Sequence, residues 1–233
     1  MKICFIADFF ADEVNGGGEL SNEELINILS TKHDVSKIKS IHFLPEHIED
    51  DVNYVVCNFI GLREDSKSLL KNYIIYEHDH KYLDNRNPAV YNNFTAPKEN
   101  IVNYDFYKNA KSVICQSTMH KEIVEKNLKL DNIISIGGNL WSEDVLDLLE
   151  NYSKNPKSKK YSIMNSHIGH KNTPETLSRI IVESRMMDMK VITNKLPGAV
   201  REPWFEKRGV ELIDIMRNKR QEISDTVINI FEE

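Results

Sequence analysis

The sequence predicts an α/β protein that consists of two units, each built on a parallel sheet. In residues 2–152, short apolar runs alternate with stretches whose apolar residues recur at helical spacing. The first pattern is typical of buried strands and the second of amphipathic helices. This alternation favours right-handed crossovers and a parallel sheet covered on both faces. Residues 153–160 are polar and basic and include a proline, which predicts a linker, and residues 161–233 then form a second, smaller α/β unit.

The elements follow from these patterns in order. In the first unit, the predicted strands are residues 2–7, 34–41, 52–59, 73–76, 112–115 and 133–136. The predicted helices are residues 17–29, 63–70, 117–128 and 142–152, the last two beginning at a serine that can cap the helix. In the second unit, we expect a strand at 161–164, a helix from 173, a strand at 189–193 and a helix from about 213 to 231.

Composition excludes several classes of protein. The chain has 233 residues, of which 40% are hydrophobic and 28% charged, so it is expected to be globular. Its net charge of −6 argues against a nucleic acid as the main partner, because phosphate binding needs a basic surface. No apolar run approaches the roughly 20 residues that span a bilayer, and the first eight residues are too short for a signal peptide.

The three cysteines indicate a reducing compartment. Cys4, Cys57 and Cys115 each lie in an apolar run, and no Cys-x-x-Cys spacing is present. Buried reduced thiols are therefore expected rather than a disulfide or metal ligands. We expect the protein to be cytoplasmic.

The stretch from Thr173 predicts a helix with two carboxylates on its polar side. Thr173 can cap this helix, and Pro174 suits its first turn. Glu175 and Glu183 would lie about 12 Å apart along the axis and roughly 80° apart around it. Two carboxylates so placed could hold both ends of an extended polar ligand; the alternative is two solvated glutamates on an amphipathic helix.

Polar residues follow two of the predicted strands, where ligands bind in open parallel sheets. Gly16, Gly17 and Gly18 open the first helix and offer free backbone N–H groups to an anion, although such a run can also be a flexible turn. Ser21 stands where a dinucleotide fingerprint has its third glycine, and no Gly-Lys-Ser/Thr follows as in a P-loop.

The second group is Glu77-His78-Asp79-His80, after the strand at 73–76. Because adjacent residues of an extended chain point to opposite faces, His78 and His80 would share a side and Asp79 would not. Three interpretations stay open: a metal site, a substrate-facing His or Asp, and a structural polar network. No Asp-x-Asp and no His/Cys cluster with ligand spacing occurs, so we expect no metal.

Taken in order, these features resemble nucleotide-sugar glycosyltransferases of the GT-B fold, which has two Rossmann-like domains, and are similar to the large retaining family 4. Residues 1–8 and 15–19 resemble its first strand and Gly-Gly-x-Glu loop. Residues 77–79 resemble its His/Asp segment beside the reacting sugar. Glu175 and Glu183 match its Glu-x7-Glu motif, and residues 190–202 fit the strand and loop that come after that motif in the family. Residues 76–82 also resemble short glycosyltransferase-like proteins of tailed phages and marine bacteria.

The resemblance implies a role for each matching residue. The residues at the transferred sugar would be His78, Asp79 and Glu175, and the donor would be bound by Gly16, Gly17, Gly18, Lys171, Thr176, Leu177 and Glu183. Thr176 and Leu177 would offer helix N-terminal N–H groups to the diphosphate, and Lys171 would neutralise the leaving group or be a plain loop charge. The implied partners are a nucleotide-sugar donor, which serves as co-substrate in place of a cofactor, and a glycan, lipid or protein acceptor. A homo-oligomer stays open.

The second unit is shorter than in the family, and this leaves two possible functions. Only six residues separate Ser166 from Thr173, where the family usually has a further strand–helix–strand–helix run that holds the nucleobase. The chain is therefore either a metal-independent retaining transferase or a shortened homologue that binds a sugar nucleotide or a protein with little or no turnover. A dinucleotide oxidoreductase is disfavoured by the missing glycine. So small a second unit should pack on the first or on a second copy, through the apolar stripe of its final helix.

Overall fold

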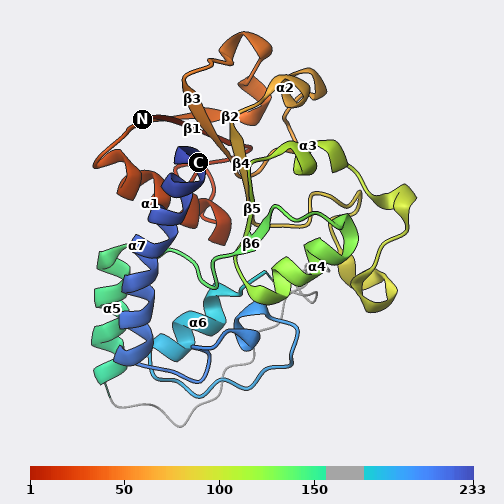
Figure 1. Ribbon diagram of the computed structural model, residues 1–233. Coiled ribbons are helices and arrows are strands. Elements are labelled where there is room, and N and C mark those ends of the chain that lie inside the picture. The colour runs from red at the N-terminus through yellow and green to blue at the C-terminus, as the bar shows by residue number, and fades with distance from the viewer. Residues whose placement is uncertain (156–175) are drawn as a thin grey trace.

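A computed structural model describes residues 1–155 and 176–233 (Figure 1). Its strands form one parallel sheet in the order β2-β1-β3-β4-β5-β6. The strands are β1 (Lys2–Ala7), β2 (Asp34–Lys39), β3 (Val52–Val56), β4 (Tyr73–Glu77), β5 (Val113–Cys115) and β6 (Ile133–Ser135). All six strands predicted for the first unit are confirmed, together with their parallel arrangement.

Helices join the strands and pack on both faces of the sheet. They are α1 (Gly17–Ser30), α2 (Glu64–Leu69), α3 (Tyr104–Asn109), α4 (Thr118–Leu128), α5 (Glu143–Lys154), α6 (Arg179–Met186) and α7 (Val210–Glu232). Short 3-10 turns are η1 (Ser40–His42), η2 (Pro45–His47), η3 (Pro88–Val90), η4 (Asn92–Phe94), η5 (Lys98–Asn100) and η7 (Gly198–Arg201). The predicted caps are confirmed, because Ser117 accepts a hydrogen bond from the His120 amide and Ser142 from the Val145 amide. None of the helices in the described ranges is long and apolar enough to cross a membrane.

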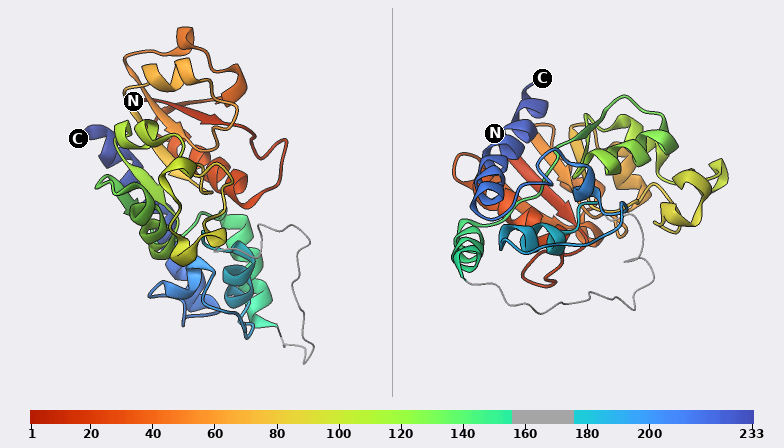
Figure 2. Two further views of the ribbon diagram at one scale, coloured as in Figure 1. Left: turned by 90° about the vertical axis from the view of Figure 1, so that its right-hand side faces the viewer. Right: turned by 90° about the horizontal axis from the view of Figure 1, so that it is seen from below.

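The two faces of the sheet carry separate apolar cores. On one face, residues of α3 and α4 pack against alternate strand residues such as Tyr54 and Val56. On the other face, α1 and α7 cover the intervening residues, for example Val55 (Figures 1 and 2). Both faces of β3 and β4 are buried, which is why these strands read as continuous apolar runs.

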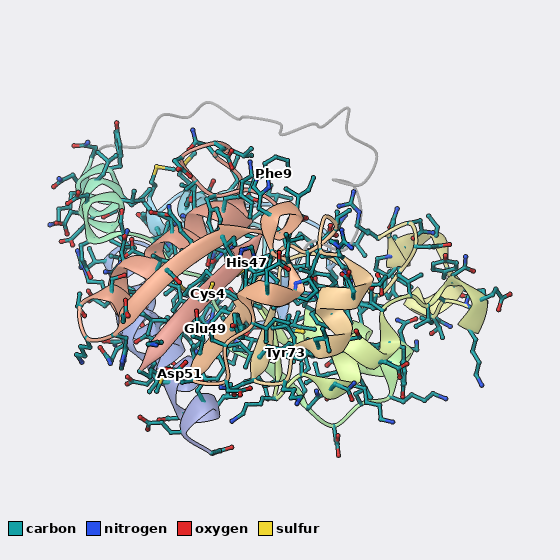
Figure 3. The ribbon with its side chains drawn as sticks, turned by 90° about the horizontal axis from the view of Figure 1, so that it is seen from above. Cys4, Phe9, His47, Glu49, Asp51 and Tyr73 are labelled. Carbon is teal, nitrogen blue, oxygen red and sulfur yellow. The ribbon has the colours of Figure 1, made fainter. Side chains whose placement is uncertain are left out.

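Two of the cysteines lie in strands of this sheet, Cys4 in β1 and Cys115 in β5, and Cys57 directly follows β3. Cys57 and Cys115 are buried and Cys4, labelled on β1 in Figure 3, is partly buried; all three are free thiols. Burial raises the pKa of each thiol above its ordinary value. The apolar surroundings expected for the cysteines are confirmed for Cys57 and Cys115, and Cys4 is less enclosed than predicted.

Helix α7 joins the C-terminal residues to the first unit. Its first half packs with α5 and α6 through Ile213 and Met216. Its second half enters the core beneath α1 through Ile223, Val227 and Phe231. The prediction that the final helix packs the C-terminal part against the first unit is therefore confirmed.

A second parallel sheet is not seen in residues 176–233, which contain no strand. The strand predicted at 189–193 is wrong: these residues have no regular structure, and Ile192 is 81% exposed. An apolar run becomes a strand only where neighbouring strands pair with it, and its expected partner at 161–164 lies outside the described residues. The predicted linker also begins too early, since α5 continues through Lys154; residues 156–160 lie outside the described part.

The helix predicted from Thr173 begins later than expected. Residues 176–178 are not helical, Ser178 has a φ of 73°, and α6 starts at Arg179. Tertiary contacts take up this segment, because the Thr176 carbonyl accepts a hydrogen bond from the Ser117 hydroxyl and the Leu177 carbonyl accepts one from the Ala199 amide. Thr176 and Leu177 therefore do not lie at a helix N-terminus. Thr173, Pro174 and Glu175 lie outside the described residues.

The contribution of α7 to the first core can be measured. Ile223→Ala removes a fully buried side chain and is expected to destabilise the protein by about 2–5 kcal/mol, because a cavity opens beneath α1. Ile180→Ala, at a site 44% exposed, is the matched control and should cost much less. Urea unfolding measures both. Equal losses for the two variants would mean that α7 contributes little to this core.

Candidate functional site

The connections of the sheet change direction between β1 and β3: β1 leads to β2 on one side, and β3 leads to β4 on the other. The loops after β1 and β3 are joined here, because Asp8 accepts hydrogen bonds of 2.9 Å from the Ile60 and Gly61 amides. Asn58, two residues after β3, donates a hydrogen bond of 3.0 Å to the Glu19 carboxylate in the first turn of α1. That carboxylate folds back over Gly16, whose added Cβ would lie against Glu19 Oε2. The Glu19 carboxylate thus lies at the N-terminus of α1, where an anionic ligand would otherwise bind.

Gly17 and Gly18 approach two side chains that come from distant parts of the sequence. A Cβ added to Gly17 would lie 3.1 Å from Cδ of Arg179, and one added to Gly18 would lie 3.1 Å from Cγ of His78. Such contacts are tighter than ordinary packing, so residues without a side chain permit this approach. The glycine run, His78 and Arg179 are therefore neighbours.

His78 is held in one tautomer by its neighbours. Gln116 accepts a hydrogen bond from the Thr176 hydroxyl (2.8 Å), so its amide group donates to Nδ1 of His78 (2.9 Å). Nε2 then carries the proton and donates to Oδ1 of Asn22 (2.6 Å). The ring centroid also lies 4.4 Å from that of Tyr76. Desolvation, with Lys81 as a further cause, lowers the pKa of His78 to about 3, so the ring is neutral.

Arg179 and Glu183 lie on one face of α6, beside an indole ring. The Arg179 guanidinium carbon is 4.5 Å from the ring centroid of Trp141, and Nη1 donates to the Leu140 carbonyl at 2.7 Å. Glu183 accepts from Arg179 Nε at 3.3 Å and from Trp141 Nε1 at 2.8 Å. Burial lowers the pKa of Arg179, and the Glu183 charge acts in the opposite direction. Arg179 thus contacts both Glu183 and Gly17.

Glu77 and Asp79, at the end of β4 and just after it, have different surroundings. Glu77 is fully buried: it accepts from the Lys81 ammonium at 3.2 Å and from the Asp79 amide at 2.8 Å, and the Tyr107 hydroxyl donates to its other oxygen. Burial raises its pKa, although Lys81 and Tyr107 oppose the shift. Asp79 is half-buried and pairs with Arg86 at 3.2 Å. Glu77 therefore belongs to a structural polar network.

His78 and His80 do not share a side, contrary to the prediction. His80 is buried, accepts from or donates to the Tyr82 hydroxyl at 3.1 Å, and its ring lies 5.0 Å from that of His120. Strand β4 ends at Glu77, so the alternation of an extended chain does not continue through these residues. No cluster of three His, Cys, Asp or Glu side chains suited to a metal occurs in residues 1–155 and 176–233.

The site therefore contains some predicted residues and several unpredicted ones. Gly17, Gly18, His78, Thr176 and Glu183 come together; Gly16 lies under Glu19, Asp79 faces Arg86, and Leu177 is buried in the core. Lys171 and Glu175 lie outside the described residues. The sequence interpretation missed Asn22, Gln116, Trp141 and Arg179. Gln116 directly follows a strand and Arg179 is four residues before Glu183, so strand-end position and helical spacing could have found these two.

Comparison of the chain with protein-family models, curated proteins and solved structures finds no match. The functional interpretation consequently depends on the residues and their geometry.

Proposed function

We propose that the protein transfers a sugar from a nucleotide-sugar donor to a glycan, lipid or protein acceptor, with retention and without a metal ion. The observation that carries this proposal is the convergence of Gly17, Gly18, His78 and Arg179 at the carboxyl edge of the sheet. The order of the glycine loop, the His/Asp segment and Glu183 along the sequence supports it through the glycosyltransferase resemblance.

In this proposal Arg179 meets the diphosphate. A nucleoside diphosphate leaves as an anion, and a guanidinium stabilises that charge with paired hydrogen bonds. Nη2 of Arg179 donates to no acceptor in the described ranges and is available for this purpose. Glu19 covers the N-terminus of α1, so the phosphates should approach Arg179 rather than the first-turn amides. The missing side chain of Gly17 leaves room beside the guanidinium.

His78 positions the sugar rather than acting as a base. Its ring is neutral, and both nitrogens have partners in Asn22 and Gln116. The buried Nδ2 group of Asn22 has no acceptor among the described residues, and a sugar hydroxyl would supply one. The amide and hydroxyl groups around His78 thus suit an uncharged, hydroxyl-rich group beside the phosphates.

A second function is favoured by one observation. Arg179 and His78 already have partners within the chain, and residues 176–233 contribute no strand to hold a nucleobase. A shortened homologue that binds a sugar nucleotide or a protein with slow or no turnover fits this arrangement, because transfer depends on holding donor and acceptor in line.

The role proposed for Arg179 can be tested by ligand-induced stabilisation. UDP-, GDP- and ADP-sugars are screened by thermal shift; at about 100 times its dissociation constant, a true donor adds roughly 2.7 kcal/mol. Arg179→Met should weaken binding about 10- to 100-fold, because a charged hydrogen bond to phosphate is lost, and Arg179→Lys should recover only part of it. Each variant is compared with its own ligand-free melting point, and chelator should change nothing.

The control is Arg63→Met, which removes an exposed guanidinium paired only with Asp65 in the described structure. Unchanged donor binding in Arg179→Met, or no stabilisation of the native protein by any donor, would overturn the proposed site. A donor-hydrolysis assay then separates the two functions: binding with hydrolysis supports the transferase, and binding without hydrolysis supports the shortened homologue.

A further inference from the structure

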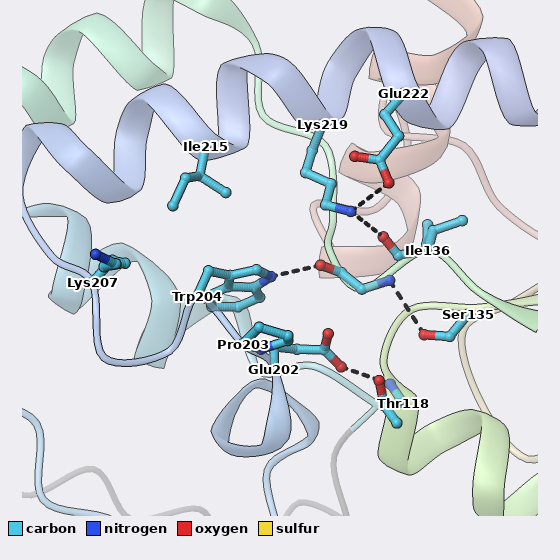
Figure 4. Close-up of a pocket in the computed structure, with 11 residues that line it drawn as sticks. Thr118, Ser135, Ile136, Glu202, Pro203, Trp204, Lys207, Ile215, Lys219 and Glu222 are labelled. Atoms are coloured by element: carbon cyan, nitrogen blue, oxygen red, sulfur yellow. Dashed lines mark hydrogen bonds and ion pairs between the residues drawn. The ribbon is translucent and has the colours of Figure 1, made fainter.

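A pocket lies beyond the carboxyl end of β6. It has a volume of about 540 Å³ and is bordered by the start of α4, the loop after β6, residues 202–207 and α7 (Figure 4). This volume falls within the roughly 300–1,000 Å³ of small-molecule sites. Two strand spacings separate β6 from β4, about 10 Å, so the pocket is adjacent to His78 but distinct from its surroundings.

A buried carboxylate faces this pocket with one oxygen unpaired. Glu202 is only 6% exposed, and its Oε1 accepts a 2.6 Å hydrogen bond from the Thr118 amide at the start of α4. Its Oε2 has no donor in the described part of the chain. That oxygen lies beside Gly137, where an added Cβ would be 2.7 Å away and where φ is +54°. The absence of a side chain at Gly137 therefore leaves Oε2 open toward the pocket.

The rest of the lining supplies complementary groups. Ser135 and Thr118 line the pocket, and their hydroxyls donate to no acceptor among the described residues, although the Ser135 oxygen accepts from the Gly137 amide at 3.2 Å. Trp204 is fixed by a 2.7 Å hydrogen bond from its indole N–H to the Gly137 carbonyl (Figure 4). Ile215 adds an apolar side chain from α7. The pocket thus combines a strong acceptor, two hydroxyl donors and an aromatic and aliphatic wall.

The charges of the lining disfavour an anionic ligand. Its basic residues are Lys207 and Lys219, and its acidic residues are Glu202 and Glu222. Lys219 pairs with Glu222 at 2.6 Å and donates to the Ile136 carbonyl at 2.8 Å, and Lys207 pairs with Glu211 at 2.5 Å. An anion would therefore meet no unpaired basic group among the described residues of this lining, whereas Glu202 stays available as a hydrogen-bond acceptor.

From this arrangement we propose that the pocket binds one ring of an uncharged sugar. A sugar hydroxyl donates to Glu202 Oε2, neighbouring sugar oxygens accept from Ser135 and Thr118, and the ring's carbon face meets Ile215, because Trp204 is only 7% exposed. The inference does not depend on the transferase activity, because none of these residues contacts Arg179 or His78 in the described structure. A phosphate would be repelled by the Glu202 carboxylate, and ammonium is compared with sugar in the test below.

The test is binding of glucose and of N-acetylglucosamine in the absence of nucleotide, by saturation-transfer NMR and calorimetry. Glu202→Gln keeps an oxygen for the Thr118 amide but removes the charged acceptor, and it should weaken sugar binding about tenfold or more. Thr118→Val leaves Glu202 in place and should also weaken binding. Glu99→Gln, an equal charge change at an exposed site after β4, should have no effect. Melting curves confirm that each variant is folded.

Three results would overturn the inference. The first is no saturation transfer from either sugar to the native protein. The second is binding that is equal in the native protein, Glu202→Gln and Thr118→Val. The third is tighter binding of inorganic phosphate or ammonium than of sugar. Arg179→Met should keep this sugar binding; loss of binding in that variant would be a fourth contrary result, because it would place the sugar at Arg179 rather than in the pocket. Failure of nucleotide-sugar binding alone bears only on the proposed function.

Discussion

Glu77→Ala is expected to destabilise the protein by about 3–5 kcal/mol. Glu77 and Lys81 form an ion pair whose side chains are 0% and 3% exposed. Removing the carboxylate leaves a buried ammonium without its counter-charge, which is far more costly than losing the attraction itself. It also leaves the Tyr107 hydroxyl and the Asp79 amide without their acceptor. Urea unfolding measures the loss as a lower midpoint.

Two further variants test whether the loss comes from the unpaired buried charge. Glu77→Leu combined with Lys81→Met removes both charges and should recover much of the stability, because apolar residues of similar size often replace a buried pair at little cost. Glu211→Ala breaks a pair with Lys207 whose side chains are 60% and 47% exposed, and it should cost at most about 1 kcal/mol. A loss for Glu77→Ala as small as that for Glu211→Ala would show that the buried network contributes little.

Stability is expected to fall steeply below pH 6.5 because three histidines are buried in the neutral form. Burial lowers the pKa of His78 to about 3 and of His80 to about 4, and it lowers that of His120 well below the ordinary value. The unfolded chain binds protons near pH 6.5 while the folded chain does not. Stability is therefore complete above pH 6.5 and is lost as the pH falls toward 4, by about 2 kcal/mol each for His78 and His80 at pH 5, and His120 adds a loss in the same direction.

A variant of His120 tests whether the buried histidines cause this dependence of stability on pH. Both of its ring nitrogens are buried without a hydrogen-bond partner among the described residues, and the His80 ring lies 5.0 Å away. His120→Leu removes two unsatisfied polar atoms and should raise stability by about 1–2 kcal/mol at pH 7. It should also flatten the dependence of stability on pH below 6.5, because the unfolded chain then takes up one proton fewer.

Unfolding by urea at several pH values provides the measurement, and His42→Leu, at an exposed site, is the control. The explanation is contradicted if His120→Leu is destabilising at pH 7 with an unchanged slope. It is also contradicted if the native protein keeps its full stability at pH 5.

The sequence predicted the sheet well because the burial of each strand requires a run of apolar residues within that strand itself. Both faces of β3 and β4 lie against helices, so nearly every residue in them is apolar. The apolar stripe of α7 was equally visible, since it is amphipathic over its whole length. The serine caps of α4 and α5 acted locally as their residue types predict.

The failures occurred where distant residues decide the local structure. Residues 176–178 carry helix-forming signals, but hydrogen bonds to Ser117 and Ala199 hold them in a non-helical turn. The strand predicted at 189–193 has no described partner strand. Within the site, Gln116 orients His78 from a different strand, and Arg179 meets Gly17 from a helix more than 160 positions further on. No spacing rule within a single segment encodes such pairs.

The path of α7 has a consequence for how the chain folds during synthesis. The sheet is finished when β6 has been made, yet the face beside α1 stays uncovered until Ile223, Val227 and Phe231 follow. At roughly 5–20 residues per second, about a hundred further residues take on the order of 5–20 s. During that interval the nascent sheet exposes an apolar face to the ribosome surface and to chaperones. The last turns of α7 therefore close the first unit, and folding of the N-terminal half is completed from the C-terminal end.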